Sequence, residues 1–402
     1  MFVGCTPLSR RLKKGAVPSQ FLWTDEPSPQ SKKRKERAEK RGENQQKKLK
    51  ETTEPNTLVD LDLQDIGAEV ECTEINSDTQ ELEETISAHP KFQECSTQTQ
   101  ISPRFCVEKY VADPAGICFY TGLESFEKFL FVFDTLGHAV HDLTYYHKTK
   151  VYQPDVRNQF FLTLVKLRRA KENFELADLF DTSETTVTNI FVTWVNFMYL
   201  QWTEVMQWPE RNLVSFHMPF DFKRQFPRTR IIVDGTEFPI QKPSAPLAQQ
   251  ATFSTYKNRN TAKVLVGVTP GGMVSYVSDA YGGSTSDRQI VERSNLPRMC
   301  DPGDVVLADK GFNVQDLFAP YDVTVNHPTF FTKKNRLTGD LVMKDRKIAS
   351  KRVHVERVIG QAKTYLILKK PLNATETKLA TRISTVCFIL TNFKTCIVPK
   401  HA

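Results

Sequence analysis

The sequence predicts an α/β domain with a mixed sheet and flanking helices, preceded by an all-α domain and by a disordered N-terminal region. Apolar residues recur at helical spacing between about residues 122 and 196, which is typical of packed amphipathic helices. Apolar, β-branched runs and a glycine turn begin at residue 229, and they indicate strands. Residues 28 to about 90 are poor in aromatic and β-branched side chains, so they cannot bury enough surface to become ordered.

Charge is distributed unevenly along the 402 residues, whose formal net charge is +7. Residues 1–50 hold 14 Lys and Arg against 5 Asp and Glu, residues 51–90 hold none against 12, and the remainder holds 40 against 30. Excess positive charge favours nucleic acid as the partner, mainly through phosphate contacts. No run approaches the roughly 18 apolar residues of a membrane span, and Met1 begins no secretory signal. We therefore expect an intracellular protein with no membrane partner.

A basic cluster near the N-terminus predicts localisation in the nucleus. It consists of Lys32, Lys33, Arg34, Lys35 and Arg37, and it is typical of a nuclear-import signal or a phosphate-binding arm. A merely solvated charge run is the alternative.

The cysteines form no Cys-x-x-Cys pair and no Cys/His cluster, which predicts reduced thiols and no structural zinc. The whole segment 28–104 is interpreted as a linker that is basic at first and then acidic.

Residues 105–220 predict a helical domain. The apolar spacing predicts one amphipathic helix from Gly122 to Leu136 and a second that begins at Pro154. A short helix over 175–180 precedes Asp181-Thr182-Ser183-Glu184, which supplies N-cap chemistry for a further helix through Trp194. Two helices joined by so tight a turn are typical of a helix-turn-helix, here at about 154–196.

The second helix of this pair is expected to face DNA. Its exposed side chains would be short and polar, which suits contacts with phosphates and base edges. They are Thr185, Thr186, Thr188 and Asn189. A plain helical bundle with a polar outer face is the alternative to the helix-turn-helix.

The period changes to that of strands after Pro227, and residues 228–398 predict the α/β domain. The expected strands are 229–233, a hairpin of 262–268 and 273–278 that turns at Pro270-Gly271-Gly272, and 304–308. Helices are expected over 351–368 and about 377–393. Strand, hairpin, strand and helix in this order indicate a mixed sheet.

Three carboxylates of this domain form the candidate site. Asp234 and Asp309 directly follow apolar strands, at the carboxyl ends where open α/β sheets place their sites. Glu356 lies in a helix whose neighbouring residues are apolar. Two Mg²⁺ ions about 3.5–4 Å apart need hard oxygen ligands. The sequence therefore predicts metal-dependent phosphoryl transfer, which needs no Ser or His nucleophile.

Ordered blocks between about residues 230 and 365 carry a family resemblance. They are VDGTE (233–237), KPS (242–244), TYK (255–257), NTAK (260–263), GGSTSD (282–287), LADKGF (307–312), IAS (348–350) and VHVERVIG (353–360). In combination they resemble the Harbinger-type DDE transposases, whose nuclease domain is RNase H-like. Asp309 and Glu356 lie 47 residues apart, which suits that family's long second interval.

The resemblance implies a DDE-type transposase and endonuclease that cleaves and transfers DNA strands. Asp234, Asp309 and Glu356 would be its catalytic metal ligands, two Mg²⁺ ions its cofactors with Mn²⁺ as a substitute, and double-stranded DNA its partner. Five cations would contact DNA phosphates, with ordinary surface charge as the alternative for each: Lys257, Lys263, Lys310, Arg352 and Lys363. Asp287 is expected to cap a helix or to support the site, and His354 to point away from Glu356.

A second resemblance concerns the N-terminus. Residues 12–21, LKKGAVPSQF, resemble the closing segment of a THAP zinc finger. The ligands of that finger would lie upstream, where only Cys5 is present. Residues 1–27 are therefore interpreted as a THAP remnant without its zinc, with a chance decapeptide as the alternative.

Other functions remain open at this point. The first is a domesticated, transposase-derived DNA-binding protein without nuclease activity. The second is an RNase H-like nuclease that acts on RNA or on DNA junctions, although a helix-turn-helix favours duplex DNA because the major groove of A-form RNA is too narrow for a helix. The third is a purely structural helical protein. A homo-oligomer and a separate DNA-binding partner protein are left open as further associations.

Overall fold

The computed structural model describes residues 104–206, 208–328 and 339–398. Every described residue belongs to one compact unit. The predicted THAP remnant, the predicted import signal and the predicted linker up to residue 103 lie outside the described residues. Within the described part, no helix is both long and apolar enough to cross a membrane.

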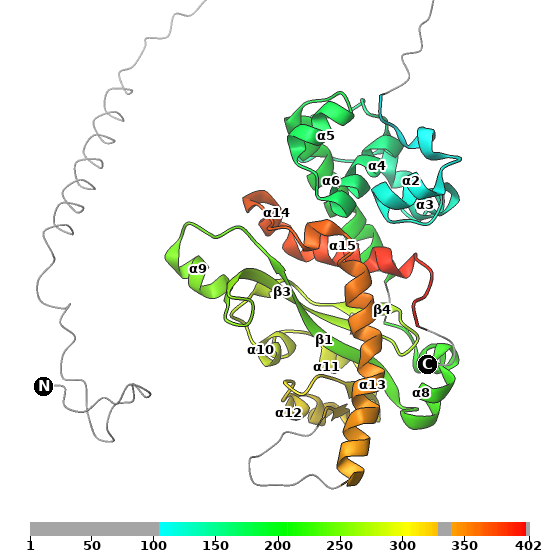
Figure 1. The fold of residues 1–402 in the computed structure, drawn as a ribbon, viewed down its shortest axis with the longest axis vertical. Helices are drawn as coiled ribbons and strands as arrows, with labels where there is room; N and C mark the ends of the chain where they lie inside the picture. The colour runs from blue at the N-terminus through cyan, green and yellow to red at the C-terminus, as the bar shows by residue number, and fades with distance from the viewer. Residues whose placement is uncertain (1–103, 207, 329–338, 399–402) are drawn as a thin grey trace, which may run out of the picture. The chain divides into compact units, whose positions relative to one another are not determined.

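The first half of this unit is helical (Figure 1). Its elements are η1 Val107–Tyr110, α2 Pro114–Thr121, α3 Phe126–Asp134, η2 His138–His141, α4 Val156–Arg169, α5 Asn173–Leu179, α6 Glu184–Val205, α7 Arg211–His217 and α8 Phe220–Gln225. The helix predicted from Gly122 begins later, because Gly122 ends α2 in the left-handed region at φ 78°. Ser125 then starts α3, where its side chain accepts a hydrogen bond from the Lys128 backbone.

Helices α4, α5 and α6 form the predicted helix-turn-helix. The turn between α5 and α6 contains Asp181 at φ 50°, and the side chain of Ser183 caps α6 by accepting from the backbone of Thr186. The helix α6 is longer than predicted, because its second half also has a buried face that includes Met198 and Trp202. This half of α6 packs against α15 Ala380–Asn392 near the C-terminus.

The second half of the unit contains a mixed sheet of seven strands. The strands are β1 Thr229–Pro239, β2 Phe253–Ser254, β3 Arg259–Val268, β4 Val274–Val277, β5 Tyr281–Gly282, β6 Val305–Leu307 and β7 Thr324–Asn326. Their order is β2-β3-β1-β6-β7, with β4 and β5 also paired to β3. The strand β3 is antiparallel to β1 and β4, whereas β6 is parallel to β1 and β7.

Helices cover both faces of this sheet. They are α9 Pro246–Thr252, α10 Asp287–Glu292, α11 Leu296–Met299, α12 Gln315–Phe318, η3 Ala319–Tyr321, α13 Gly339–Ala362, η4 Leu366–Leu368, α14 Ala374–Lys378 and α15. Figure 1 shows α13 lying across the sheet, where its Val355 and Val358 share a core with Ile232 of β1. The other face packs on α10, α11 and α12 through a second core around Ile231. The predicted RNase H-like mixed sheet with flanking helices and an upstream helical region is thus confirmed.

The strand β1 is longer than predicted, and its pairing explains why. Its parallel partner β6 ends at the pair Ile232 and Leu307, where the predicted strand also nears its end. Its antiparallel partner β3 continues to the pair Pro239 and Thr261, and this pairing extends β1 beyond its apolar run. Asp234 therefore lies within a strand, which corrects the expectation that it directly follows one.

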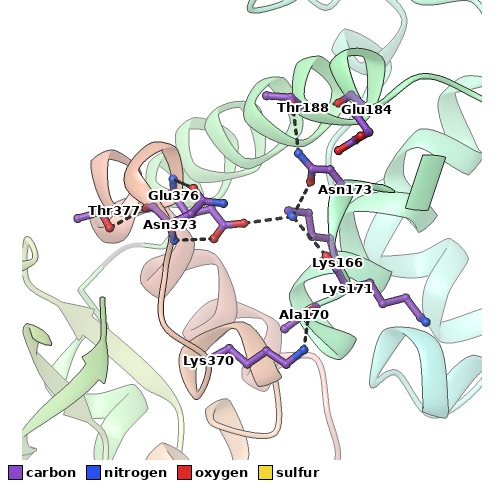
Figure 2. A network of polar contacts seen from close by, with 10 residues as sticks. All are labelled: Lys166, Ala170, Lys171, Asn173, Glu184, Thr188, Lys370, Asn373, Glu376 and Thr377. Carbon is purple, nitrogen blue, oxygen red and sulfur yellow. Dashed lines mark hydrogen bonds and ion pairs between the residues drawn. The ribbon is translucent and has the colours of Figure 1, made fainter. Parts of the chain in front are cut away.

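A polar network joins the helix-turn-helix to the C-terminal helices (Figure 2). The ammonium group of Lys166 in α4 lies 3.1 Å from Glu376 Oε1 in α14, and both side chains are largely buried. The same ammonium donates to Asn173 Oδ1 at 2.8 Å. Lys370 donates to the backbone carbonyl of Ala170 at 3.0 Å, just after the end of α4. These contacts hold the helix-turn-helix against the C-terminal end of the α/β domain.

Candidate active site

The parallel register of β1 and β6 sets the positions of the two aspartates. Ile232 pairs with Leu307, and Asp234 and Asp309 each come two residues later in their segments. Side chains at alternate positions of a strand point to the same face, so Asp234 faces the same side as Ile232. This is the face on which α13 packs. The two aspartates are thus brought to one end of the parallel pair, beside α13.

The helix α13 adds Glu356 and Arg352 to the two aspartates. One guanidinium group contacts all three carboxylates: Arg352 Nη1 lies 2.9 Å from Asp309 Oδ1, and Nη2 lies 3.5 Å from Glu356 Oε1 and 3.9 Å from Asp234 Oδ2. Residues four apart are neighbours on a helix surface, which explains the contact between Arg352 and Glu356. The structure therefore brings together the three carboxylates that the sequence singled out.

The three carboxylates differ in exposure. The side chain of Asp234 is 21 % exposed, against 48 % for Asp309 and 53 % for Glu356. Burial raises the pKa of Asp234 to about 6, the Arg352 charge lowers it, and the Asp309 and Glu356 charges raise it. The surroundings of Asp234 therefore disfavour its negative charge.

The donor set fits a divalent metal ion. Carboxylate oxygens are the hard ligands that Mg²⁺ and Mn²⁺ prefer, and further positive charge would relieve the electrostatic penalty at Asp234. Within the described ranges, however, no group of three His, Cys, Asp or Glu side chains is arranged to hold a metal ion. In the described structure, Arg352 instead supplies one positive charge to the three carboxylates.

Lys263 and Asp287 form an ion pair next to Gly235, the residue that follows Asp234 in β1. Lys263 Nζ lies 3.0 Å from Asp287 Oδ1, and both side chains are partly buried. Gly235 makes room for this pair, since a Cβ atom there would lie 2.4 Å from Asp287 Oδ1. Asp287 is not the cap of α10, because the side chain of Ser286 makes the capping bonds. The structure therefore contradicts the expected capping role of Asp287, and support of the site stays a prediction.

The other predicted phosphate contacts occupy different environments. Lys363 is partly buried just after α13, where burial and the nearby Lys257 lower its pKa while Asp234 and Glu237 raise it. Lys257 is exposed, and its ammonium lies 4.4 Å from the ring centre of Tyr256. Lys310 directly follows Asp309, and its backbone donates to Asp309 Oδ1 at 2.7 Å. Lys363 thus lies near Asp234 and Lys257 lies near Lys363, and both carry charge of the sign that binds phosphate.

Among the predicted DNA-facing residues of α6, Thr185 alone is classed as exposed. Thr186 and Thr188 are partly exposed, and Thr188 Oγ1 accepts from Asn173 Nδ2 at 2.9 Å. The prediction that Asn189 is exposed to DNA is wrong, because its side chain is buried and the residue is only 4 % exposed. Its side chain accepts from the backbone of His147 and donates to the carbonyl of Thr149. Asn189 therefore fastens that segment to α6 and is not presented to DNA.

Two residues show what the sequence could and could not reveal. His354 is buried, and its Nδ1 lies 3.1 Å from the carbonyl oxygen of Pro270, so it packs away from the carboxylates as predicted. Arg352 was predicted to contact DNA, but its contact with three carboxylates was missed. Its i to i+4 spacing from Glu356 was the one available signal, and this spacing does not reveal the two aspartates.

Comparisons with known proteins agree with this geometry. Residues 233–392 match the family model of the DDE superfamily endonuclease, and residues 155–203 match the helix-turn-helix of DDE superfamily endonuclease. A search of curated proteins gave no match. The first matched segment contains all three carboxylates, and the second covers nearly all of α4 to α6. The chain therefore carries a DDE superfamily endonuclease domain preceded by the helix-turn-helix of that superfamily.

Proposed function

We propose that this protein is a Harbinger-type DDE transposase whose endonuclease domain cleaves and transfers DNA strands in a metal-dependent reaction. The observation that carries the proposal is the convergence of Asp234, Asp309 and Glu356 on one guanidinium group. They come from a strand, from the segment after a parallel strand and from a helix. A protein that used this domain only as a scaffold would not need three carboxylates close together, because their partial burial and mutual repulsion destabilise the fold.

The three carboxylates would hold two divalent cations, Mg²⁺ or Mn²⁺. When bound, such cations lower the pKa of a water or a DNA 3′-hydroxyl and stabilise the leaving oxygen. Asp234 and Asp309 would fix the ligand positions through the sheet, and Glu356 would complete the set from α13. Lys257 and Lys363 would bind phosphates of the strand that enters the site.

The helix-turn-helix would bind duplex DNA. Thr185, with the partly exposed Thr186 and Thr188, would contact the DNA through α6. The polar network of Figure 2 would keep α6 at a fixed position relative to the nuclease domain. We also propose that the basic cluster Lys32–Arg37 directs the protein to the nucleus.

The substitution Asp309→Asn tests the proposed activity. The side chain is about half exposed, so we expect little loss of stability, intact binding of duplex DNA in EDTA and loss of Mg²⁺-dependent cleavage. Asp316→Asn is a matched control, since Asp316 is also an exposed carboxylate in an ion pair with an arginine, Arg288. Equal cleavage by Asp309→Asn and the parent would remove Asp309 from the site.

A domesticated DNA-binding protein is the second candidate function. The observation that favours it is that Arg352 contacts the carboxylates from within the protein and that, among the described residues, they are not arranged around a metal position. Calorimetric titration with Mn²⁺ separates the two candidates. A parent protein that binds duplex DNA but neither binds Mn²⁺ nor cleaves DNA would establish the domesticated function.

A further inference from the structure

Arg352 has an unusual position for a cation of a DNA-binding surface. It is 9 % exposed, and its guanidinium group is directed at the three carboxylates. We propose that Arg352 is an internal counter-ion that occupies the carboxylate centre in the metal-free protein and has to leave it before divalent cations bind. This inference rests on the proposed function, and it adds a step of regulation to the same site.

The charge balance supports a temporary role for Arg352. Three carboxylates and one guanidinium leave a net negative charge when all are ionised, so the centre still attracts cations. At the same time the guanidinium uses the carboxylate oxygens that a metal ion would need: Oδ1 of Asp309, Oε1 of Glu356 and Oδ2 of Asp234. A metal ion and the guanidinium would also repel each other at such distances. A metal ion and the guanidinium of Arg352 in its observed position therefore compete for the same carboxylates.

The structure of the side chain makes such an exchange feasible. Arginine is always charged and offers five N–H donors in a planar fork, so one residue can serve three carboxylates. Its Nε has no hydrogen-bond partner, which leaves the guanidinium held by the carboxylates alone among the polar contacts described for it. The Cα of Arg352 is fixed on α13, so the freed guanidinium would remain beside the site. Contact of Arg352 with a DNA phosphate would then follow metal binding and not precede it.

The test compares metal binding by the full-length protein and an Arg352→Gln variant in the absence of DNA. We expect the variant to bind Mn²⁺ about tenfold more tightly in calorimetry, which corresponds to about 1.4 kcal/mol. Without metal, the variant should melt at a lower temperature than the parent, because the carboxylates lose their counter-ion. Added Mn²⁺ should then raise its melting temperature more than that of the parent.

Arg230→Gln is the matched control. Arg230 is another buried arginine between two carboxylates, with Nη1 3.5 Å from Asp301 Oδ2 and Nε 3.8 Å from Asp304 Oδ2. It lies four residues before Asp234 in β1, or about 13 Å along the strand. This variant should also melt at a lower temperature without metal, but its affinity for Mn²⁺ should equal that of the parent. Asp309→Asn removes one of the proposed ligands, so the heat of Mn²⁺ binding that disappears in this variant is the heat that arises at the carboxylate centre.

Arg352→Lys separates charge from geometry. A lysine keeps the charge but offers a single flexible ammonium, which cannot reach three carboxylates in the same manner. Its affinity for Mn²⁺ should lie between those of the parent and Arg352→Gln. The inference is overturned if Arg352→Gln binds Mn²⁺ as the parent does or more weakly while the parent still cleaves DNA. If no variant and no parent binds Mn²⁺, both this inference and the proposed function fail.

Discussion

The ion pair between Lys166 and Glu376 offers a test of how the helix-turn-helix is attached. The two side chains are 6 % and 12 % exposed, and their charged atoms lie 3.1 Å apart (Figure 2). Removal of one partner of a buried pair typically costs about 3–5 kcal/mol, because the other charge stays buried. We therefore consider the variant Glu376→Gln, which removes the negative charge and keeps the shape.

Two features of the structure reduce the expected loss. Lys166 would keep its hydrogen bond to Asn173 and its position 5.1 Å from the ring centre of Phe191. The new amide oxygen could still accept from the Asn373 backbone, as Glu376 Oε2 does at 3.1 Å. We expect a loss of about 2–3 kcal/mol in the free energy of unfolding. In a domain of this size that is a fall of about 5 °C in melting temperature.

Thermal denaturation of the full chain measures the stability that Glu376→Gln loses, and two further variants serve as its controls. Glu175→Gln removes the charge of an exposed i to i+4 pair with Lys171, and it should cost less than about 1 kcal/mol. The double variant Lys166→Met with Glu376→Gln leaves no unpaired charge, so it should be more stable than Glu376→Gln alone. Equal, small changes in melting temperature for Glu376→Gln and Glu175→Gln would refute the reasoning. It would also be refuted if the double variant lost as much stability as Lys166→Met and Glu376→Gln lose together as single variants.

Lys394 makes stability depend on pH. Burial, with a further contribution from Arg168, lowers the pKa of Lys394 from 10.5 to about 8. The unfolded chain therefore binds more protons between these values, and stability rises with pH across this window. In thermal denaturation, the melting temperature of Lys394→Met should exceed that of the parent most near about pH 7.5 and least near about pH 9.5. A difference in melting temperature that does not change with pH would contradict this. In α6, Thr185→Ala should weaken duplex binding in mobility shifts without a change in melting temperature. Asn189→Ala should lower the free energy of unfolding by about 1–3 kcal/mol, and with it the melting temperature, because its bonds to His147 and Thr149 are lost. Similar melting temperatures and DNA affinities of the two variants would contradict the different burial of Thr185 and Asn189.

Local patterns allowed much of the fold to be predicted. The hairpin of β3 and β4 was predicted from two apolar runs around a glycine pair, and Gly272 indeed adopts φ 91° in its turn. The helix-turn-helix followed from apolar spacing and from the cap at Ser183. The helix α2 was not predicted, and its boundary with α3 was missed, because Gly122 can stand inside a helical pattern as well as at its end.

Long-range pairing decided what the local patterns left undetermined. The extent of β1 depends on β3, which continues the strand to Pro239 through a less apolar stretch. The burial of Asn189 depends on the segment at His147 and Thr149, which lies forty residues earlier in the chain. Neither partner is visible in the spacing of the residues around β1 or α6.

The sequence by itself determined which chemical groups are available: two aspartates near the ends of apolar runs, a glutamate in an amphipathic helix and a set of basic residues. The tertiary structure decided their geometry. The register of Ile232 with Leu307 places the aspartates at one level of the sheet, and the packing of α13 turns Glu356 and Arg352 toward them. Register and helix orientation depend on contacts between residues far apart in the chain, whereas sequence patterns report only the local period of burial.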